Sequence, residues 1–452
     1  MIHLRKVTCL LIASLSLIGC VDALHSQQPP QMWSAGFWFW QGNTTGNAWS
    51  GDPLDVLFIQ AGTIDKDSSV TPKWRVYGSL PDDFPDAREY WIVYRYERQG
   101  VPDLQAATIL AREVSQTLAA MRKSNHNVAG VQLDIDSPTG SLTKYATFLR
   151  EFRKGIPKDS QISITALLDW FRPHTDIGEV IKEVDEFVPQ FYDTAERDRY
   201  GGGSAIAAKI DAMKWGPVFN RFRKRFRVGI STFGRSIMVA ADGRSARAYY
   251  SRDVAPIDIA MNSAFQLQTA RNQANELLLN YRAVRKVRIA YNDFAPGDTM
   301  QFILSTPESI AAATESAHQM RGYLAGVVFF RWSDSTTRLS MQPQEVLIAA
   351  GLTTRKVPSS NRILAIDGGC AAMSCADIYI ESVKPFSPKP VQYHIRSSTE
   401  LAYFLPEKNL PARMTGPSQI ELSLPPFCAR GRLYLGRAVT AKQAAFTVEE
   451  ER

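Results

Sequence analysis

Two aspartates, Asp134 and Asp136, stand two residues apart at the end of an apolar run that begins at Gly130. Side chains two residues apart on a β-strand point to the same face, so both carboxylates should face one site. Two neighbouring carboxylates cannot both ionise freely, and the pKa of one of them rises. A carboxyl group with a raised pKa can protonate a leaving oxygen, as glycosidic bond cleavage requires. In the structural alternative, the pair caps a helix or bonds within the core.

Polar and aromatic residues also end the next two apolar runs of the chain. Carboxylates, amides and rings at the carboxyl ends of parallel strands are the groups with which barrel enzymes bind substrate. We therefore predict substrate contacts there, although Tyr192 and Asp193 could be ordinary rim residues, and Asp169 could start a helix beside a packing Trp170. The residues at these two ends are Asp169, Trp170, Gln190, Tyr192 and Asp193.

Three tryptophans near the start of the chain, Trp38, Trp40 and Trp49, could form an aromatic platform for a sugar. Phe37 to Trp40 is equally typical of a buried strand. Trp38 is the one that we include among the predicted substrate-binding residues, together with Gln132 between the apolar residues that precede Asp134.

These residues need a scaffold, and the pattern of the chain predicts one. Eight apolar runs alternate with segments of helical periodicity over residues 33–352, which is typical of a (β/α)8 TIM barrel of the α/β class. A ninth run, Val287 to Tyr291, is expected to belong to an insertion. The eight predicted strands are Ala35–Trp40, Asp55–Ala61, Tyr90–Tyr96, Val131–Asp136, Ile162–Leu168, Phe187–Tyr192, Phe226–Thr232 and Val327–Trp332.

Residues 356–440 carry short alternating runs split by Pro and Gly, which predicts a small all-β sandwich domain. This region also holds Cys370, Cys375 and Cys428. In an oxidising compartment one disulfide is expected. Proximity favours Cys370 with Cys375, leaving Cys428 free or buried.

The first 20 residues indicate export. Arg5 and Lys6 precede an apolar stretch too short to span a bilayer permanently. It ends in Leu17-Ile18-Gly19-Cys20, which resembles a bacterial lipobox and implies a signal peptide cleaved before a lipidated Cys20. Residues 21–32 would then be a polar tether, and we expect a lipoprotein of the outer membrane that faces the periplasm. The alternative is an ordinary secretory signal.

The formal net charge is +7, and about +5 without Arg5 and Lys6. The densest basic stretch, Arg221 to Arg227, would suit a solvated helix end, or else an anionic glycan or lipid headgroup. We predict no nucleic-acid partner. The scattered histidines and the absence of nucleotide-binding motifs predict no metal site and no cofactor, and the sequence identifies no protein partner.

The run from Ala129 to Asp136 resembles the D-G-x-D-x-D-x-E strand of the family-18 glycoside hydrolases. The resemblance implies that Asp134 orients a substrate acetamide and that Asp136 takes the place of the catalytic glutamate. Gln190-Phe191-Tyr192-Asp193 and Trp332-Ser333 resemble the ends of two other strands of that family. This implies that Tyr192 supports the acetamide and that Trp332 lies under the sugar.

The chain departs from this pattern at Ala129 and Gln132, where the family has acids, and at the shorter side chain of Asp136. It more closely resembles a bacterial family of unknown function, DUF 3142. That resemblance lies in two segments and implies no activity. They are Asp134-Ile135-Asp136-Ser137-Pro138-Thr139 and Ser163-Ile164-Thr165-Ala166-Leu167.

Three functions remain open at this point. The protein could hydrolyse an envelope or extracellular polysaccharide, with N-acetylated sugars as one substrate class, by a substrate-assisted and retaining mechanism. It could bind such a glycan, or assist envelope assembly, without catalysis. It could also be a structural partner whose cleft is filled by its own side chains. An open site around Asp134 and Asp136 would favour the first two.

Overall fold

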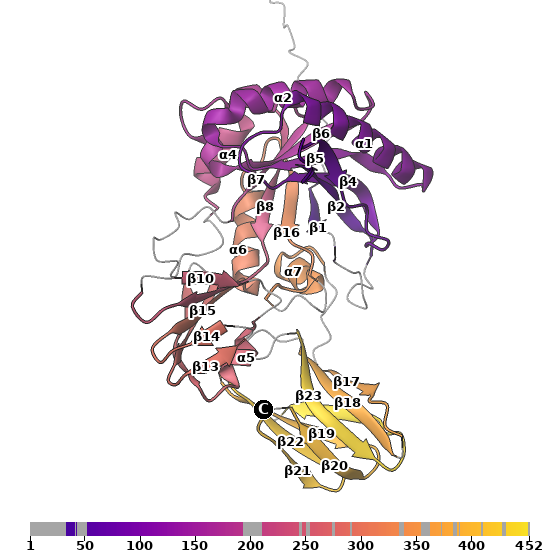
Figure 1. Cartoon of the computed structure of the whole chain (residues 1–452), viewed down its shortest axis with the longest axis vertical. Helices are drawn as coiled ribbons and strands as arrows, with labels where there is room; N and C mark the ends of the chain where they lie inside the picture. The colour runs from indigo at the N-terminus through magenta and orange to yellow at the C-terminus, as the bar shows by residue number, and fades with distance from the viewer. Residues whose placement is uncertain are drawn as a thin grey trace, which may run out of the picture. The chain divides into compact units, whose positions relative to one another are not determined.

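The computed structural model describes most of the chain from Trp33 to Glu450 (Figure 1). The predicted signal peptide, Cys20 and the predicted tether lie outside the described residues. The described ranges are 33–40, 42, 52–192, 210–243, 246–249, 254–273, 276–289, 292–333, 339–353, 362–371, 373–382, 387, 389–407, 410–426 and 431–450.

Eight parallel strands close into a barrel, because β1 pairs with both β2 and β16. The predicted TIM barrel is therefore confirmed, with all eight predicted strands in place. Their apolar runs are buried on both faces, as expected for parallel strands covered by helices. The strands are β1 (Ser34–Phe39), β2 (Leu54–Lys66), β4 (Ala87–Tyr96), β5 (Val128–Ile135), β6 (Gln161–Leu167), β7 (Glu186–Gln190), β8 (Arg225–Ser231) and β16 (Leu324–Phe330).

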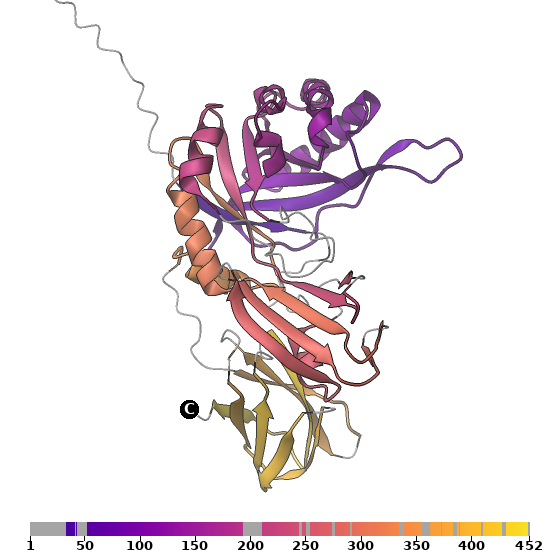
Figure 2. The same ribbon diagram turned by 90° about the vertical axis from the view of Figure 1, so that its left-hand side faces the viewer.

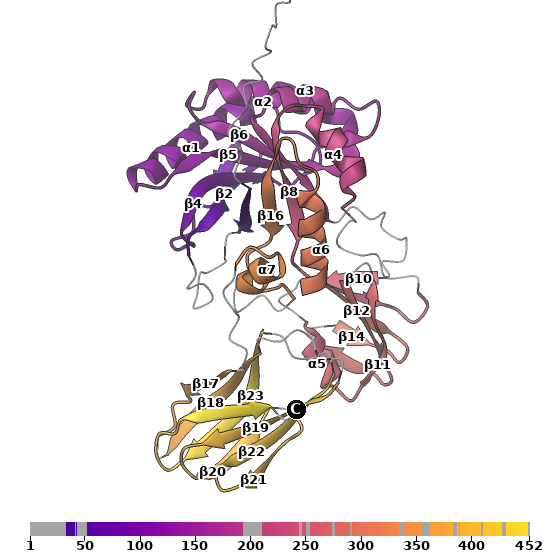
Figure 3. The same cartoon turned by 180° about the vertical axis from the view of Figure 1, so that it is seen from behind.

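Helices cover the outside of the barrel (Figure 3). In α1, Leu110, Val114 and Leu118 recur at helical spacing and are buried, and Asp103 caps the first turn by accepting a hydrogen bond from the Ala106 amide at 3.0 Å. No helix in the described part of the chain combines the length and apolarity needed to cross a bilayer. The helices are α1 (Leu104–Lys123), α2 (Leu142–Lys154), α3 (Ile177–Lys182), α4 (Ala212–Asn220), α6 (Pro307–His318) and α7 (Pro343–Ala349).

The expectation of a helix after every strand was wrong between β2 and β4. All residues of that link are described, and they form β3 (Trp74–Tyr77) instead, which pairs antiparallel with the long end of β2. The link is interrupted by Pro72, Gly78, Pro81 and Pro85. Proline and glycine destabilise a helix interior, and no stretch between them is long enough for a helix that covers the barrel.

A separate antiparallel sheet is formed by the segment between β8 and β16 (Figure 2). The run at Val287 does belong to an insertion, as expected, but its extent was not foreseen. Leu279, Met300 and Phe302 form part of its own core. The sheet has the order β10 (Ala246–Tyr249), β9 (Arg235–Val239), β15 (Thr299–Leu304), β12 (Glu276–Ala283) and β11 (Phe265–Gln273), accompanied by α5 (Pro256–Ala260) and the hairpin β13 (Val287–Ile289) and β14 (Asn292–Phe294).

The C-terminal region forms two four-stranded antiparallel sheets that share one apolar core, including Ile378, Ile395 and Leu435. The last strand ends at Glu450, beyond the boundary expected at residue 440. Cys370 and Cys375 form the predicted disulfide, and Cys428 lies outside the described residues. The first sheet has the order β17 (Arg362–Asp367), β18 (Ser374–Ser382), β23 (Gly431–Thr440) and β20 (Leu401–Pro406). The second has the order β21 (Ala412–Gly416), β22 (Gln419–Leu424), β19 (Val391–Ser397) and β24 (Phe446–Glu450).

A buried ionic network fills the barrel near the starts of its strands. Arg227 on β8 is 1% exposed, and its Nε donates to both carboxylate oxygens of Glu186, the first residue of β7, at 3.0 and 3.1 Å. The same guanidinium donates to Glu89 on β4 at 3.0 Å and to Ser34 on β1. Four strands are thus linked at this end, opposite to the carboxyl ends that carry the candidate site.

Candidate active site

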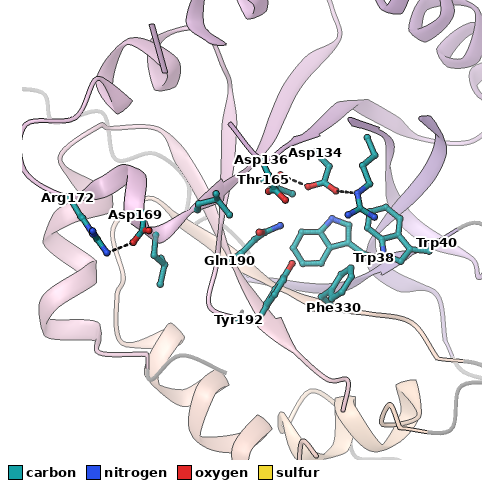
Figure 4. Close-up of a pocket in the computed structure, with 13 residues that line it drawn as sticks. Trp38, Trp40, Asp134, Asp136, Thr165, Asp169, Arg172, Gln190, Tyr192 and Phe330 are labelled. Atoms are coloured by element: carbon teal, nitrogen blue, oxygen red, sulfur yellow. Dashed lines mark hydrogen bonds and ion pairs between the residues drawn. The ribbon is translucent and has the colours of Figure 1, made fainter. Parts of the chain in front are cut away.

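A cavity of about 500 Å³ opens at the carboxyl ends of the barrel strands (Figure 4). One part of its wall is aromatic and another is charged, which is the composition expected of a site for a polar ligand with apolar faces. The aromatic residues are Trp38, Trp40, Tyr192 and Phe330, and the charged residues are Arg95, Asp134, Asp136, Asp169 and Arg172.

Asp134, near the end of β5, is held inside this cavity by residues of both neighbouring strands. Thr165 on β6 donates a hydrogen bond to its Oδ1 at 2.7 Å, and Nε of Arg95 on β4 lies 3.3 Å from its Oδ2. Burial, followed by the negative charge of Asp136, raises the pKa of Asp134 to about 6, against the opposing effects of Arg95 and Thr165. Asp134 is therefore an oriented carboxyl group that can carry a proton near neutral pH.

Asp136 follows directly after β5 and lines the same cavity, so the two carboxylates share one face as their spacing predicts. Asp136 is exposed to solvent, whereas Asp134 is buried. The walls still displace enough water to raise the pKa of Asp136, and the charge of Arg95 opposes this rise. The more strongly raised pKa thus belongs to the deeper carboxyl, while the more accessible one faces an incoming ligand.

Tyr192 and Gln190 come from the end of β7 and complete the polar part of the cavity. Burial, together with the charges of Asp134 and Asp136, raises the pKa of Tyr192 well above its usual value. Its phenol therefore stays protonated and can donate a hydrogen bond. The Tyr192 ring stacks on Phe330 with centroids 5.2 Å apart, which fixes the direction of the hydroxyl.

Asp169 also lines the cavity, where it forms an ion pair with Arg172 at 2.7 Å. Both side chains are more than half exposed, so this pair lies at the rim. The neighbouring Trp170 does not line the cavity. It is buried against Tyr145 and donates a hydrogen bond to the Ser137 carbonyl at 2.8 Å, which is the packing role left open for it.

Gln132 lies beneath the cavity rather than in its wall. Its Oε1 accepts a hydrogen bond from Trp38 Nε1 at 2.6 Å, and its Nε2 donates to Ser163 at 3.1 Å. The side chain is fully buried. The structure thus places Gln132 where it orients Trp38, with both ends of its amide already engaged inside the barrel.

Trp332 also lies away from the cavity. It is fully buried and packs against Phe37 and Phe39, with ring centroids 5.5 and 5.8 Å apart, between the barrel and its helices. Phe330 occupies the position in the cavity that was predicted for Trp332. Phe330 is the last residue of β16, and strand alternation no longer determines where side chains point beyond that residue.

Arg95, Thr165, Arg172 and Phe330 were missed from the sequence. A lone arginine or threonine at a strand end forms no recognisable pattern, and only the strand order shows that Arg95 and Thr165 flank Asp134. The predicted Asp193 and Trp49 lie outside the described residues. Across the described ranges, no cluster of three or more His, Cys, Asp or Glu side chains is placed to hold a metal ion.

Several solved structures share a distant likeness with the chain. A chitinase from Chromobacterium violaceum ATCC 12472 is 13% identical with a TM-score of 0.44, over 71% of this chain and 98% of that one. Chitinase ChiA74 from Bacillus thuringiensis is 10% identical with a TM-score of 0.45, over 92% and 100%. The spore cortex-lytic enzyme SleL of Bacillus megaterium QM B1551 is 14% identical with a TM-score of 0.42, over 71% and 75%.

These TM-scores are too low to assign an activity, and the fold is established by the strand pairing itself. No curated protein matches the sequence. One family model does match, over residues 86–290, a range that contains Arg95, Asp134, Asp136 and the segment from Ser163 to Leu167. In this range the chain matches the domain of unknown function DUF3142, as the I-D-x-D and S-I-T-A-L segments predicted.

Proposed function

We propose that this protein is a glycoside hydrolase that acts on a polysaccharide containing N-acetylated sugars. The observation that carries the proposal is the carboxylate pair Asp134 and Asp136, with raised pKa values, in one aromatic-lined cavity of about 500 Å³. A cavity of this size can hold one or two sugar rings, and its aromatic wall suits their apolar faces. The cavity is open, which argues against the structural-partner hypothesis.

In the proposed reaction Asp136 is the general acid, because it is the more accessible of the two carboxyls that line the cavity. It protonates the leaving glycosidic oxygen while the substrate's own acetamide oxygen bonds to the anomeric carbon, and the glycosidic bond breaks. Water then opens this cyclic intermediate and returns a proton to Asp136. Asp134 and the Tyr192 hydroxyl hold the acetamide during both steps.

A second candidate function, glycan binding without catalysis, has two observations in its favour. The larger rise in pKa falls on Asp134, which is buried, and not on the accessible Asp136. Asp136 also has one methylene fewer than the glutamate at the matching position of the family-18 glycoside hydrolases, which withdraws the carboxyl by about 1.5 Å. The variants below separate the two functions.

The test uses the purified chain with a glycan panel that pairs N-acetylated polymers, such as chitin and peptidoglycan, with the non-acetylated polymer cellulose. Released reducing ends measure turnover, and calorimetry measures binding. Asp136→Asn should lower turnover by about 10²- to 10⁴-fold and leave binding nearly intact, because the amide keeps the shape and cannot donate an acidic proton. Asp134→Asn should weaken both, because Asp134 contacts the acetamide in the ground state too.

Asp136→Glu shows whether the site is built around the shorter side chain. Turnover should fall if the cavity walls fit aspartate, and rise if they leave room for glutamate. Asp82→Asn, an exposed aspartate away from the cavity, is the matched control and should change neither quantity. Equal turnover in both Asp136 variants and the wild type would exclude Asp136 as the acid, and binding without products would establish the second function.

For the location of the protein, we propose anchoring through lipid chains on Cys20 at the outer membrane, with the barrel in the periplasm. The order of basic, apolar and lipobox residues in positions 1–20 supports this. The disulfide between Cys370 and Cys375 is in keeping with an oxidising compartment.

A further inference from the structure

Arg95 is placed to act on the carboxylate pair through direct contact with Asp134. It is the penultimate residue of β4, and in the parallel pairing of β4 with β5 it is the register partner of Asp134. Its Nε lies 3.3 Å from Asp134 Oδ2, and its other guanidinium edge lies 3.2 Å from Glu97 Oε1. The guanidinium carbon is 6.0 Å from the ring centroid of Trp40. The Arg95 guanidinium thus has Asp134, Glu97 and the Trp40 ring as its neighbours.

The charged and titratable groups around Asp134 come from each neighbouring element. Asp136 lies just after the strand that carries Asp134, Arg95 is on β4, Glu97 lies just after β4, and Thr165 on β6 contributes a neutral hydroxyl. Burial, together with the charge of Asp134, raises the pKa of two nearby phenols, Tyr145 on α2 and Tyr192 after β7. The other arginine of the cavity, Arg172, pairs with Asp169 instead. Among the described residues, Arg95 is therefore the cation that opposes the two negative charges.

We propose that Arg95 is a positioning residue that fixes Asp134 against β4 and ensures that the Asp134–Asp136 pair carries one proton rather than two. This role rests on the proposed hydrolase function. Without a neighbouring cation, burial favours the neutral form of both carboxyls. A doubly protonated pair could still donate a proton, but it would lack the negative charge that stabilises the positively charged acetamide intermediate.

The pH–rate profile provides the first test. If one proton on the pair is required, activity falls at low pH when the second proton binds and at high pH when the first is lost. Arg95 lowers the pKa of both carboxyls. Arg95→Met should therefore shift both the acid and the alkaline limb to higher pH, by about 1 unit. Arg95→Lys keeps the charge and should leave the limbs near their wild-type positions.

Arg172→Met is the matched control, because it removes an arginine from the same cavity that is not paired with Asp134 or Asp136. Whatever it does to the rate, both limbs should stay in place. If Arg95→Met does not fold, Arg95→Gln gives the same test, since it keeps a hydrogen-bond donor and loses the charge. Equal shifts in the Arg95→Met and Arg172→Met proteins would contradict a specific role for Arg95.

A second readout needs no substrate. Carboxyl-carbon NMR of the full chain, labelled at aspartate, follows the titration of Asp134, whose resonance is assigned by its loss in Asp134→Asn. Its midpoint should rise by about 1 unit in Arg95→Met and stay close to wild type in Arg95→Lys. An unchanged midpoint in Arg95→Met overturns the proposal. If the midpoint moves as expected and no form of the protein releases sugar, the effect of Arg95 on the pair stands and the hydrolase function fails.

Discussion

At the scale of single residues, the site places a carboxyl where the fold itself disfavours its charge. Asp134 is 7% exposed, and its folded pKa of about 6 lies above the ordinary value of 3.8. Its two contacts, with Thr165 and Arg95, offset the desolvation only in part. A residue that is held at such a cost to stability is typical of a functional site.

The stability of the protein should therefore depend on pH through Asp134. Because the folded pKa is raised, the folded state binds the proton more tightly, and this stabilisation is complete below pH 3.8 and lost as pH rises through 6. A shift of about 2 units corresponds to about 3 kcal/mol. In Asp134→Asn, the free energy of unfolding relative to wild type should therefore increase by up to about 3 kcal/mol between pH 4 and pH 7. Urea denaturation at both values measures it, and a difference that does not change with pH would contradict the raised pKa.

The residues of the site were predictable where a pattern marked them. Asp134, Asp136, Gln190 and Tyr192 end predicted strands, and all four line the cavity. Arg95 could not be found in this way, because its role depends on the register of β4 with β5, which the sequence does not show.

At the scale of the elements, continuous apolar runs identified the barrel strands because a parallel strand is buried on both faces. The strands of the insertion were missed for the opposite reason. In β12 and β15 the apolar runs are only three residues long, Leu277–Leu279 and Phe302–Leu304, and the rest of each strand includes polar residues such as Asn280 and Gln301, so neither run is as long as those of the barrel strands. Their partners are also distant in sequence, since β15 pairs with β9.

The ionic network at the strand starts should be among the most sensitive points of the fold. Glu186 is fully buried and Arg227 is 1% exposed. Glu186→Gln leaves the Arg227 charge without its main partner, so we expect a loss of about 3–5 kcal/mol in the free energy of unfolding. Glu179→Gln, which removes an exposed ion pair with Lys182, should leave the free energy of unfolding nearly unchanged, because solvent screens this pair. Similar losses for the two variants, measured by urea denaturation, would show that the buried network does not stabilise the barrel.

At the scale of the whole molecule, the barrel and the C-terminal region have separate apolar cores. The barrel carries the cavity, and the C-terminal region has its own apolar core and its own disulfide. Residues 21–32 would give a tether of 12 residues between the proposed anchor and Trp33. Fully extended, it would reach about 40 Å, so the barrel would work close to the membrane surface.

The anchor leads to a prediction that does not depend on the chemistry of the cavity. Lipid chains on both the thiol and the amine of Cys20 would bind the protein stably, since one chain alone gives only marginal binding. The wild-type chain, expressed in a Gram-negative host, should therefore be found in the membrane fraction, with a mature mass that includes the lipid. Cys20→Ala should lose that mass and should no longer be cleaved before residue 20. Cys428→Ala, a matched cysteine change in the C-terminal region, should remain in the membrane fraction. If Cys20→Ala shows the same mature mass and the same distribution as wild type, then Cys20 is not lipidated and the segment is an ordinary secretory signal.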